Sequence, residues 1–313
     1  MSKRLRLALI AGGKSGEREI SLKGAREVLK ALNTNKYKVR QYDPVHDLER
    51  LAGDAPKTDV AFILLHGPMG EDGSIQGFLD LLGVPYQGSG LLGSALAMNK
   101  HLSKLLYQQS GLKTAESVLL TPHSGPAGEE ISEKLGLPLV IKPVSQGSSL
   151  GLNIIHNLAE FGPALSNSFQ IDREVLVEPY IKGREITVGV IGNQKLTALP
   201  VVEIIPDQQH PFFDYTAKYT PGATSEICPA DFPEEITFEA RDYGVKAHRA
   251  LGLRGYSRTD MIVSETGEIF IMETNTIPGM AATSLFPLAA QEYGLSFSAL
   301  IDRLIELAIE YRT

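Results

Sequence analysis

Four polar residues near the carboxyl-terminal end of the sequence have the types and the spacing of a metal site. Side chains alternate along a strand, so Arg258 and Asp260 share one face of a predicted strand. Glu273 and Asn275 share a face of the next strand for the same reason. A hairpin that turns at Thr266 places Asp260 opposite Glu273, within one residue of register. Two carboxylates and an amide carbonyl are hard oxygen ligands, which suit Mg²⁺ bound jointly by protein and nucleotide phosphates.

An exposed polar sheet face with ordinary cross-strand pairs is the alternative interpretation of these two strands. It is disfavoured by Ile262, Ile269 and Ile271, which predict that both strands are mostly buried. A buried carboxylate is costly unless it is paired or bound to a metal. We therefore favour the metal site.

A lysine followed by a glycine- and serine-rich loop could bind phosphate groups. Lys142 ends a predicted strand, and the loop Gly147 to Gly151 comes shortly after it. The backbone N–H groups and hydroxyls of such a loop can surround phosphate oxygens, and the lysine adds a point charge. A hairpin loop beside a solvated lysine explains these residues equally well.

The segment Glu178 to Glu185 follows a valine-rich strand near the middle of the chain. A linker between two lobes can hold an adenine against backbone groups, while a carboxylate accepts hydrogen bonds from ribose hydroxyls. Taken by itself, however, this segment is better explained as an ordinary turn with surface charges.

Two loops in the first third of the chain carry carboxylates where a predicted helix starts, at Gly13 to Glu19 and at His66 to Gly73. Each acid could simply cap its helix, because negative charge is favourable at a helix amino terminus. Both loops also follow a strand, and ligands of parallel α/β sheets bind at the carboxyl ends of strands. This shared position favours a site.

Two further patterns look like nucleotide-binding loops and are rejected. Residues 13–15 would end a P-loop whose first glycine falls at position 8, but that residue is Ala8. Gly88, Gly90 and Gly93 have the spacing of a dinucleotide fingerprint, yet they end the first α/β unit instead of following its first strand.

The elements that must position these groups differ between the two ends of the chain. Over roughly the first 95 residues strands alternate with helices, which predicts a parallel α/β unit. The predicted strands there are Leu5 to Ile10, Tyr37 to Tyr42, Asp59 to Leu65 and Val84 to Tyr86, and the predicted helices are Ser21 to Leu32 and Ser74 to Leu82.

From Asn99 onward the pattern predicts two α+β lobes. The longest irregular stretch, Gln208 to Cys228, is long enough to be an active-site lid. The predicted helices are Asn99 to Gln109, Phe232 to Leu251 and Phe297 to Tyr311, and the predicted strands are Val118 to Thr121, Leu139 to Lys142, Val175 to Tyr180, Ile186 to Ile191, Leu196 to Ile205, Gly255 to Val263 and Glu268 to Asn275.

Composition limits the class of protein. A chain of 313 residues is enough for two or three domains. Its 30 basic and 37 acidic residues give a net charge of −7, which argues against nucleic-acid and membrane partners. The single cysteine excludes a disulfide framework. No apolar run reaches the roughly 20 residues of a membrane span, and no signal-peptide core is present, so we expect a cytoplasmic protein.

Taken together, the motifs resemble those of the ATP-grasp superfamily and, within it, of the D-alanine–D-alanine ligases. The resemblance covers essentially the whole chain in order. The matching motifs are Gly-Gly-x-Ser-x-Glu-Arg-Glu at 12–19, His-Gly-x-x-Gly-Glu-Asp-Gly at 66–73, Lys-Pro-x-x-x-Gly-Ser-Ser-x-Gly at 142–151, Asp-Tyr-x-Ala-Lys-Tyr at 214–219, Arg-x-Asp at 258–260, Glu-x-Asn-Thr-x-Pro-Gly-Met at 273–280 and Ser-Leu at 284–285.

The resemblance implies an α/β protein with α+β lobes, built as a three-domain ATP-grasp fold. The implied divisions are an N-terminal parallel α/β domain over 1–97, a central lobe over 98–180, and a C-terminal lobe over 181–313 with a lid loop at 208–228. It implies ATP between the last two lobes, two Mg²⁺ ions with Mn²⁺ as a substitute, a monovalent cation, and a homodimer. The implied activity joins two D-alanines for peptidoglycan precursors through an acyl phosphate.

The resemblance also implies a role for each matched residue. The implied metal ligands are Asp260, Glu273 and Asn275. The implied ATP contacts are Lys100, Lys142, Ser148, Ser149, Glu178, Ile181, Glu185 and Lys218. The implied substrate contacts are Glu17 for the first ammonium, Ser284 and Leu285 for the second carboxylate, and His66, Arg258 and Gly279. The implied catalytic residues are Arg258 and Gly279, which stabilise the tetrahedral oxyanion, and Glu17, Ser148 and Tyr219, which close the lid by hydrogen bonding.

Two alternatives stay open at this point. A ligase of this kind could take D-serine or D-lactate as its second substrate, although depsipeptide-forming relatives have histidine where this chain has Tyr219, which argues against D-lactate. An ATP-binding regulatory protein of the same fold is the second alternative. The intact Arg258, Asp260 and Glu273 argue against it.

Overall fold

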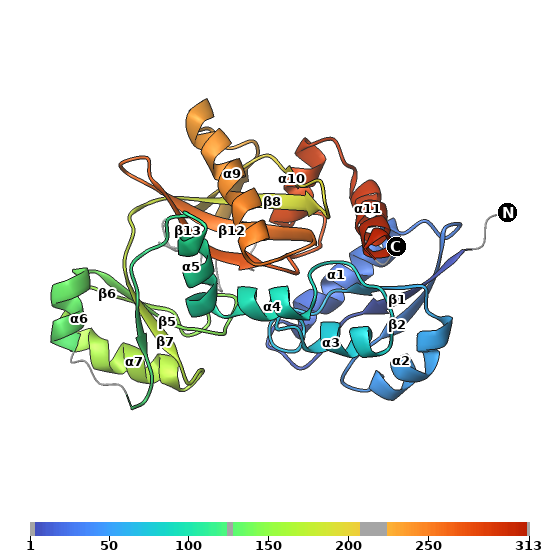
Figure 1. The fold of residues 1–313 in the computed structure, drawn as a ribbon, viewed down its shortest axis with the longest axis horizontal. Helices are drawn as coiled ribbons and strands as arrows, with labels where there is room; N and C mark the ends of the chain where they lie inside the picture. The colour runs from blue at the N-terminus through green and yellow to red at the C-terminus, as the bar shows by residue number, and fades with distance from the viewer. Residues whose placement is uncertain (1–3, 124–127, 207–223, 312–313) are drawn as a thin grey trace.

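The computed structural model describes residues 4–123, 128–206 and 224–311, which are organised around three β-sheets (Figure 1). In the first sheet β1 (Leu5–Ile10) lies between β2 (Tyr37–Tyr42) and β3 (Val60–Ile63), and all three strands are parallel. β3 is a short apolar run that is buried on both faces, and β1 is buried in the same way from Leu7 to Ile10, as parallel strands usually are. The predicted parallel α/β unit is therefore confirmed.

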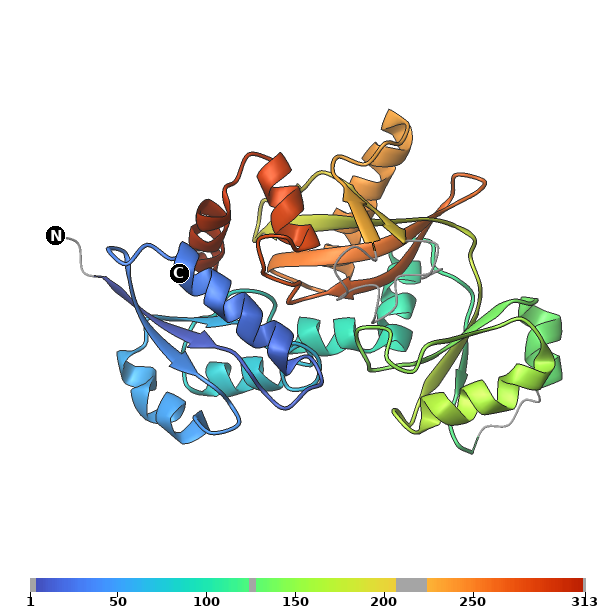
Figure 2. The same ribbon diagram turned by 180° about the vertical axis from the view of Figure 1, so that it is seen from behind.

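Helices cover both faces of this first sheet (Figures 1 and 2). Leu7 and Leu9 of β1 face a core that includes Val28 of α1 (Arg18–Ala31) and Leu304 of the last helix, α11 (Phe297–Glu310). The alternate residues of β1 face a second core, which α2 (Leu48–Asp54) and α3 (Ser74–Leu81) complete. The C-terminal helix therefore packs against the N-terminal sheet.

The second sheet is antiparallel, with the strand order β4-β7-β5-β6. Two helices, α6 (Gly128–Leu135) and α7 (Phe161–Phe169), pack on one core with these strands. A short 3-10 helix, η2 (Leu158–Glu160), leads into α7. The strands are β4 (Val118–Leu120), β5 (Leu139–Pro143), β6 (Asn153–Ile155) and β7 (Val175–Pro179).

The third sheet follows the order β11-β10-β8-β12-β13, with β9 paired to β8. Ile186 and Val188 of β8 face α9 (Glu234–Ala250), whereas Ile191 faces the core that contains α10 (Leu285–Glu292). The two helices therefore cover opposite faces. The strands are β8 (Gly183–Gly192), β9 (Thr197–Ala198), β10 (Val202–Pro206), β11 (Thr224–Ile227), β12 (Gly255–Ser264) and β13 (Ile269–Asn275).

Two consecutive helices, α4 (Leu91–Met98) and α5 (Lys100–Gln109), connect the first sheet to the other two. Asn99 separates them and caps α5, because its side chain accepts a hydrogen bond from the Leu102 N–H group. α5 packs beside the third sheet, where the Tyr107 hydroxyl donates a 2.7 Å hydrogen bond to Thr274. This contact fixes the carboxyl-terminal part of α5 next to β13.

The structure corrects several of the predicted elements. Val84 to Tyr86 is not a strand and makes only one bridge, between Tyr86 and Ala61. The predicted strand Leu196 to Ile205 is divided into β9 and β10 at Pro200, which has no N–H group for a sheet. The predicted irregular stretch Gln208 to Cys228 ends earlier, because β11 pairs with β10, and residues 207–223 lie outside the described residues.

Among the described residues, five α-helices and two strands, β6 and β11, were not predicted. The helices α2, α4, α6, α7 and α10 have at most nine residues each, β6 has three and β11 has four. Elements this short offer little periodicity from which to identify them. Among the described residues no helix is both long and apolar enough to cross a membrane.

Candidate active site

A cavity of about 330 Å³ opens between the second and third sheets. Its walls include apolar side chains from both sheets, among them Val140, Ile154, Ile262 and Met272. Most of its polar lining was predicted from separate motifs of the sequence. The predicted residues that line it are Lys100, Lys142, Ser149, Glu178, Ile181, Glu185, Asp260 and Glu273.

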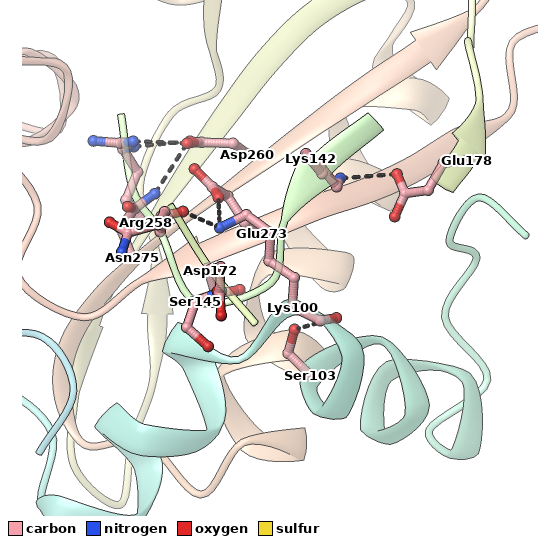
Figure 3. A network of polar contacts seen from close by, with 12 residues as sticks. Lys100, Ser103, Lys142, Ser145, Asp172, Glu178, Arg258, Asp260, Glu273 and Asn275 are labelled. Carbon is pink, nitrogen blue, oxygen red and sulfur yellow. Dashed lines mark hydrogen bonds and ion pairs between the residues drawn. The ribbon is translucent and has the colours of Figure 1, made fainter. Parts of the chain in front are cut away.

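The hairpin of β12 and β13 brings the predicted metal ligands together (Figure 3). Asp260 pairs with Glu273 and Arg258 pairs with Asn275, in the register that the alternation of side chains predicted. A β-bulge follows Asp260, so the remaining pairs of the hairpin are shifted by one residue. Adjacent carboxylates therefore stand at the edge of the cavity.

Asp260 is held by three neighbouring side chains. Arg258 donates to both carboxylate oxygens, from Nε over 2.8 Å and from Nη2 over 2.7 Å. Thr187 Oγ1 donates over 2.6 Å, and Asn275 Nδ2 donates over 3.0 Å. Burial alone would lower the pKa of Arg258, but the charge and hydrogen bonds of Asp260 outweigh burial and raise it. The guanidinium is therefore permanently charged beside this carboxylate.

The amide of Asn275 is oriented by the same network. Because its Nδ2 group donates to Asp260, its Oδ1 atom is the one left to accept a hydrogen bond or bind a cation. In the described part of the chain no three residues among His, Cys, Asp and Glu gather as a metal site. The predicted set consists of two carboxylates and this amide. Their oxygen atoms are ligands of the kind that bind Mg²⁺ together with phosphate oxygens.

Lys100 stands at the first turn of α5 and reaches the same edge of the cavity (Figure 3). Its Nζ atom lies 3.2 Å from Glu273 Oε2 and donates to the Gln146 carbonyl. The contact with Gln146 joins α5 to the loop after β5. Lys100 therefore connects the hairpin carboxylates with the loop that was predicted to surround phosphate.

Glu178 lies between two lysines on the floor of the cavity. Lys142 Nζ is 2.8 Å from Oε2, and Lys104 Nζ contacts Oε1. Burial alone would raise the pKa of Glu178, but the charges of Lys142 and Lys104 outweigh burial and lower it. Burial lowers the pKa of Lys104 to about 8 against the opposing effect of Glu178. We assign an ion pair at neutral pH, because both direct contacts favour the charged forms.

Lys104 was missed by the sequence reasoning. It follows Lys100 by four residues on α5, so the two lysines occupy the same helix face. This spacing was the available signal, but a basic helix face is more often solvated.

Glu17 contacts Ser148 in the loop Gly147 to Gly151, which was predicted to bind phosphate. Ser148 Oγ donates to Glu17 Oε1, and both Ser148 and Ser149 have positive φ angles, of 52° and 56°. Glu17 stands at the N-cap position of α1, but its side chain makes no capping hydrogen bond there. A Cβ atom at Gly67 would lie 3.3 Å from Glu17 Oε2, so glycine permits the close approach of that loop. Tyr219 and Lys218 lie outside the described residues.

His66 and Glu71 lie near Glu17 and Arg258. Burial lowers the pKa of His66 despite the charge of Glu17, and the charge of Arg258 lowers it further, so the imidazole is neutral. Burial and the charge of Glu17 raise the pKa of Glu71 to about 8. Glu71 Oε2 accepts a 2.7 Å hydrogen bond from Gly67. Glu71 stood in a quoted motif, but no role was predicted for it.

The predicted second-substrate residues lie in the loop that leads into α10. A Cβ atom at Gly279 would lie 3.1 Å from Ser284 Oγ, which accepts a hydrogen bond from the Ala281 N–H group. Leu285 begins α10, and its side chain is buried in the core that α11 also joins. A contact between Leu285 and a ligand would therefore involve its backbone.

Two protein-family models match the chain. "D-ala D-ala ligase C-terminus" matches residues 106–306, and "D-ala D-ala ligase N-terminus" matches residues 41–89. A D-alanine–D-alanine ligase of Syntrophobacter fumaroxidans is 57% identical over 309 residues, covering 99% of each chain. Another, of Desulfotalea psychrophila, is 52% identical and covers 99% of this chain and 96% of its own.

Two solved structures are also similar to this chain over nearly its whole length. The D-alanine–D-alanine ligase of Bacillus anthracis in complex with ATP superposes with a TM-score of 0.86 at 33% identity, over 98% of both chains. The VanG D-Ala:D-Ser ligase of Enterococcus faecalis superposes with a TM-score of 0.83 at 32% identity, over 98% of this chain and all of its own.

Proposed function

The chain belongs to the D-alanine–D-alanine ligase family of the ATP-grasp fold, and from this premise we propose how its residues join two D-alanine molecules with ATP. The enzyme is a D-alanine–D-alanine ligase that uses ATP, and its dipeptide serves peptidoglycan synthesis. The observation that carries the proposal is the cavity between the second and third sheets, where lysines and carboxylates from separate motifs meet.

The cavity offers a different environment to each part of the nucleotide. Its apolar walls suit an adenine ring, with Ile181 in the linker between the two sheets and Glu185 near the start of β8 for the base and the ribose. Lys100 and Lys142 line the polar side and suit the phosphate groups. Ser149 lies in the loop beside them. Lys218 is a further predicted phosphate contact.

Asp260, Glu273 and Asn275 would hold the two Mg²⁺ ions, with Mn²⁺ as a substitute. Their fit rests on the paired carboxylates at the cavity edge and on the Asn275 Oδ1 atom, which the network leaves as an acceptor. When bound, the ions neutralise charge on the phosphates. A monovalent cation stays a prediction.

The proposed reaction has two steps. A carboxylate oxygen of the first D-alanine, whose ammonium Glu17 receives, attacks the γ-phosphorus of ATP, and the bond to the departing ADP breaks. The amine of the second D-alanine then attacks the carbonyl carbon of the acyl phosphate and gives up a proton. The carbon–oxygen bond breaks and inorganic phosphate leaves.

Charge that develops in the second step needs donors that are already in place. Arg258 is fixed by Asp260 in two hydrogen bonds, so it can stabilise the oxyanion without reorganising. The Gly279 N–H group is the second proposed donor. Ser284 and Leu285 would bind the second carboxylate, and neutral His66 lies beside Glu17. Closure by Ser148 and Tyr219 would exclude water, which otherwise hydrolyses the acyl phosphate.

The identity of the second substrate distinguishes the alternatives that the sequence left open. The D-Ala:D-Ser ligase of E. faecalis shares the fold at 32% identity, against 57% for the S. fumaroxidans ligase, so D-alanine is favoured. ADP release should be measured with D-alanine alone and with D-alanine plus D-serine or D-lactate, followed by product analysis. Dominant D-alanyl-D-alanine is expected. A D-serine product in excess would overturn the assignment of the second substrate, and ATP binding without ADP release would favour the regulatory alternative.

We also propose the homodimer and the division into domains at 97/98 and 180/181. Exposed leucines on three consecutive helices support the dimer, because an exposed apolar patch often marks a protein interface. They are Leu81 of α3, Leu91 and Leu92 of α4, and Leu102 and Leu105 of α5.

A further inference from the structure

A second cavity, of about 150 Å³, lies on the first sheet, remote from the nucleotide site. It lies beside the amino-terminal half of β1 and along β2 from Lys38 to Tyr42, on the face that α2 and α3 partly cover. The catalytic loops Gly13 to Glu19 and His66 to Gly73 follow the carboxyl-terminal ends of β1 and β3. No residue that lines this second cavity also lines the cavity between the second and third sheets, so the two are separate.

Four basic side chains line this cavity, although the whole chain has a net charge of −7. Arg6 comes from β1, Lys38 and Arg40 come from β2, and Lys57 comes from η1 (Ala55–Lys57). Asp54 is the one acid in the lining, and Asp59 adjoins it through Arg6. The six charges sum to +2.

Both arginines are held in fixed orientations. Arg6 Nε and Nη2 donate to Asp59 over 3.0 Å and 2.6 Å, so these bonds leave the Nη1 hydrogens for another acceptor. Arg40 Nη1 donates to Asp54 over 2.6 Å, and the Tyr42 hydroxyl donates to the same oxygen over 2.8 Å. A guanidinium held in this way loses little side-chain freedom when it binds a ligand.

The two lysines lack comparable partners. Within residues 4–123, 128–206 and 224–311, neither Lys38 nor Lys57 has a carboxylate within ion-pair distance. Lys38 pairs in register with Arg6 in the parallel β1–β2 ladder, so two like charges stand side by side on one face. Like charges in such a pair are destabilising. An anion between them would remove the repulsion.

We propose that this pocket binds inorganic phosphate. Arginine and lysine are the side chains that recognise phosphate oxygens, and the pocket offers both around one space. Its volume is less than half that of the nucleotide cavity, so it fits a free phosphate ion better than a nucleotide. The anion would contact the free N–H groups of Arg6 and Arg40 and the ammonium groups of Lys38 and Lys57.

The test uses the whole enzyme with its nucleotide site filled by Mg²⁺ and a non-hydrolysable ATP analogue. Thermal unfolding is followed while sodium phosphate is added, against sodium chloride of equal ionic strength. A ligand that binds only the folded state raises Tm in a saturable way. The test variant is Lys38→Gln/Lys57→Gln. The control variant, Lys23→Gln/Lys30→Gln, changes net charge equally on the exposed face of α1.

The wild-type enzyme and the control should show a saturable Tm increase with phosphate, and the test variant should show at least a tenfold weaker apparent affinity. In sodium chloride alone, Lys38→Gln should raise Tm, because it removes the repulsion from Arg6. The proposal is overturned if phosphate acts no differently from chloride on the wild-type enzyme. It is equally overturned if the test variant and the control respond alike.

Discussion

At the residue scale, the site depends on carboxylates that are each matched to a cation. Asp260 is paired with Arg258, Glu273 with Lys100, and Glu178 with two lysines. Because these groups are buried or half-buried, removing one partner leaves an uncompensated charge. We therefore expect single substitutions of these carboxylates to have large effects, on turnover for Glu273 and on stability for Glu178.

Glu273→Gln should abolish most turnover while the protein stays folded. The change removes the negative charge opposite Asp260 but keeps a side chain of the same size. Loss of several kcal/mol of charge stabilisation corresponds to about 10²-fold to 10⁴-fold in rate. Coupled ADP release measures this loss. Glu268→Gln is the matched control, because Glu268 is exposed next to the same hairpin, where its carboxylate pairs with Lys113 and accepts a hydrogen bond from Thr266. Near-normal ADP release by Glu273→Gln would contradict the metal assignment.

Glu178→Gln should instead reduce stability, because Lys104 and Lys142 would lose their shared partner. Breaking a buried ion pair from one side costs about 3–5 kcal/mol. Urea unfolding measures the change. The double variant Glu178→Gln/Lys104→Met should recover part of the loss, since it removes one of the unpaired charges. A double variant no more stable than Glu178→Gln would show that Lys104 does not need this carboxylate.

Glu71 should make stability depend on pH around neutrality. Its pKa in the folded protein is about 8, against an ordinary value of 4.5, so the folded state keeps a proton that the unfolded state has lost. Stability therefore falls as pH rises through this window, by on the order of 2 kcal/mol between about pH 6 and 8.5. Glu71→Gln should flatten this dependence and raise Tm most at pH 8.5. An unchanged pH profile of Tm would contradict the assignment.

The relative positions of the candidate site residues could be predicted from the sequence where local geometry dictates them. Asp260 and Glu273 could be paired because alternation along two strands and one turn fixes which side chains meet. The partner of Glu178 could not be found in this way, since Lys104 is 74 residues distant and reaches it only through the packing of α5. Glu71 was visible in its motif, but its pKa depends on neighbours from other elements.

At the element scale, long and amphipathic helices were predicted correctly from the sequence, whereas short or evenly apolar helices were not. α9 and α11 have 17 and 14 residues, with apolar residues repeating at helical spacing, and both were predicted within a few residues. α4 was missed because its sequence, Leu-Leu-Gly-Ser-Ala-Leu-Ala-Met, is apolar on most sides. Tertiary packing, not periodicity, decides the conformation of such a segment.

The docking of α9 on the third sheet should be sensitive to acid. His248 of α9 is buried, and its Nδ1 atom lies 2.8 Å from Ser257 Oγ on β12. Burial lowers its pKa from 6.5 to about 4. The unfolded chain therefore takes up a proton first, and stability present above pH 6.5 is lost as pH falls toward 4, by on the order of 3 kcal/mol.

His248→Asn should remove most of this acid sensitivity, because asparagine can still bond to Ser257 and does not titrate. Chemical unfolding at pH 7 and at pH 5 measures the difference. His156→Asn is the control, since His156 is exposed. If wild type and His248→Asn lose the same stability between these pH values, His248 is not the group responsible.

At the scale of the whole molecule, helices α4 and α5 run between the first sheet and the cavity between the second and third sheets (Figures 1 and 2). The order of lobes was readable from the change in pattern near residue 99. Their packing was not, because nothing local in α11 indicates that it joins the first sheet.

The exposed leucines of α3 and α4 should determine the oligomeric state. Leu81 is 89% exposed and Leu92 is 68% exposed, so a monomer would leave both in water. Leu81→Glu/Leu92→Glu should convert a dimer to a monomer with an unchanged Tm at low concentration. Sedimentation analysis measures the mass. Phe238→Glu, which alters a residue of α9 that is 76% exposed, is the control. A monomeric wild-type enzyme, or a variant that stays dimeric, would contradict this interface.

Because α11 is synthesised long after the first sheet, its packing on that sheet can form only late in synthesis on the ribosome. From Ala31, where α1 ends, to Glu310, where α11 ends, the numbers differ by 310 − 31 = 279 residues. At about 5–20 residues per second, the last helix emerges about 14–56 s after the first. For that time the face of β1 that carries Leu7 and Leu9 lacks part of its cover, and a message truncated before α11 yields a first lobe that never acquires it.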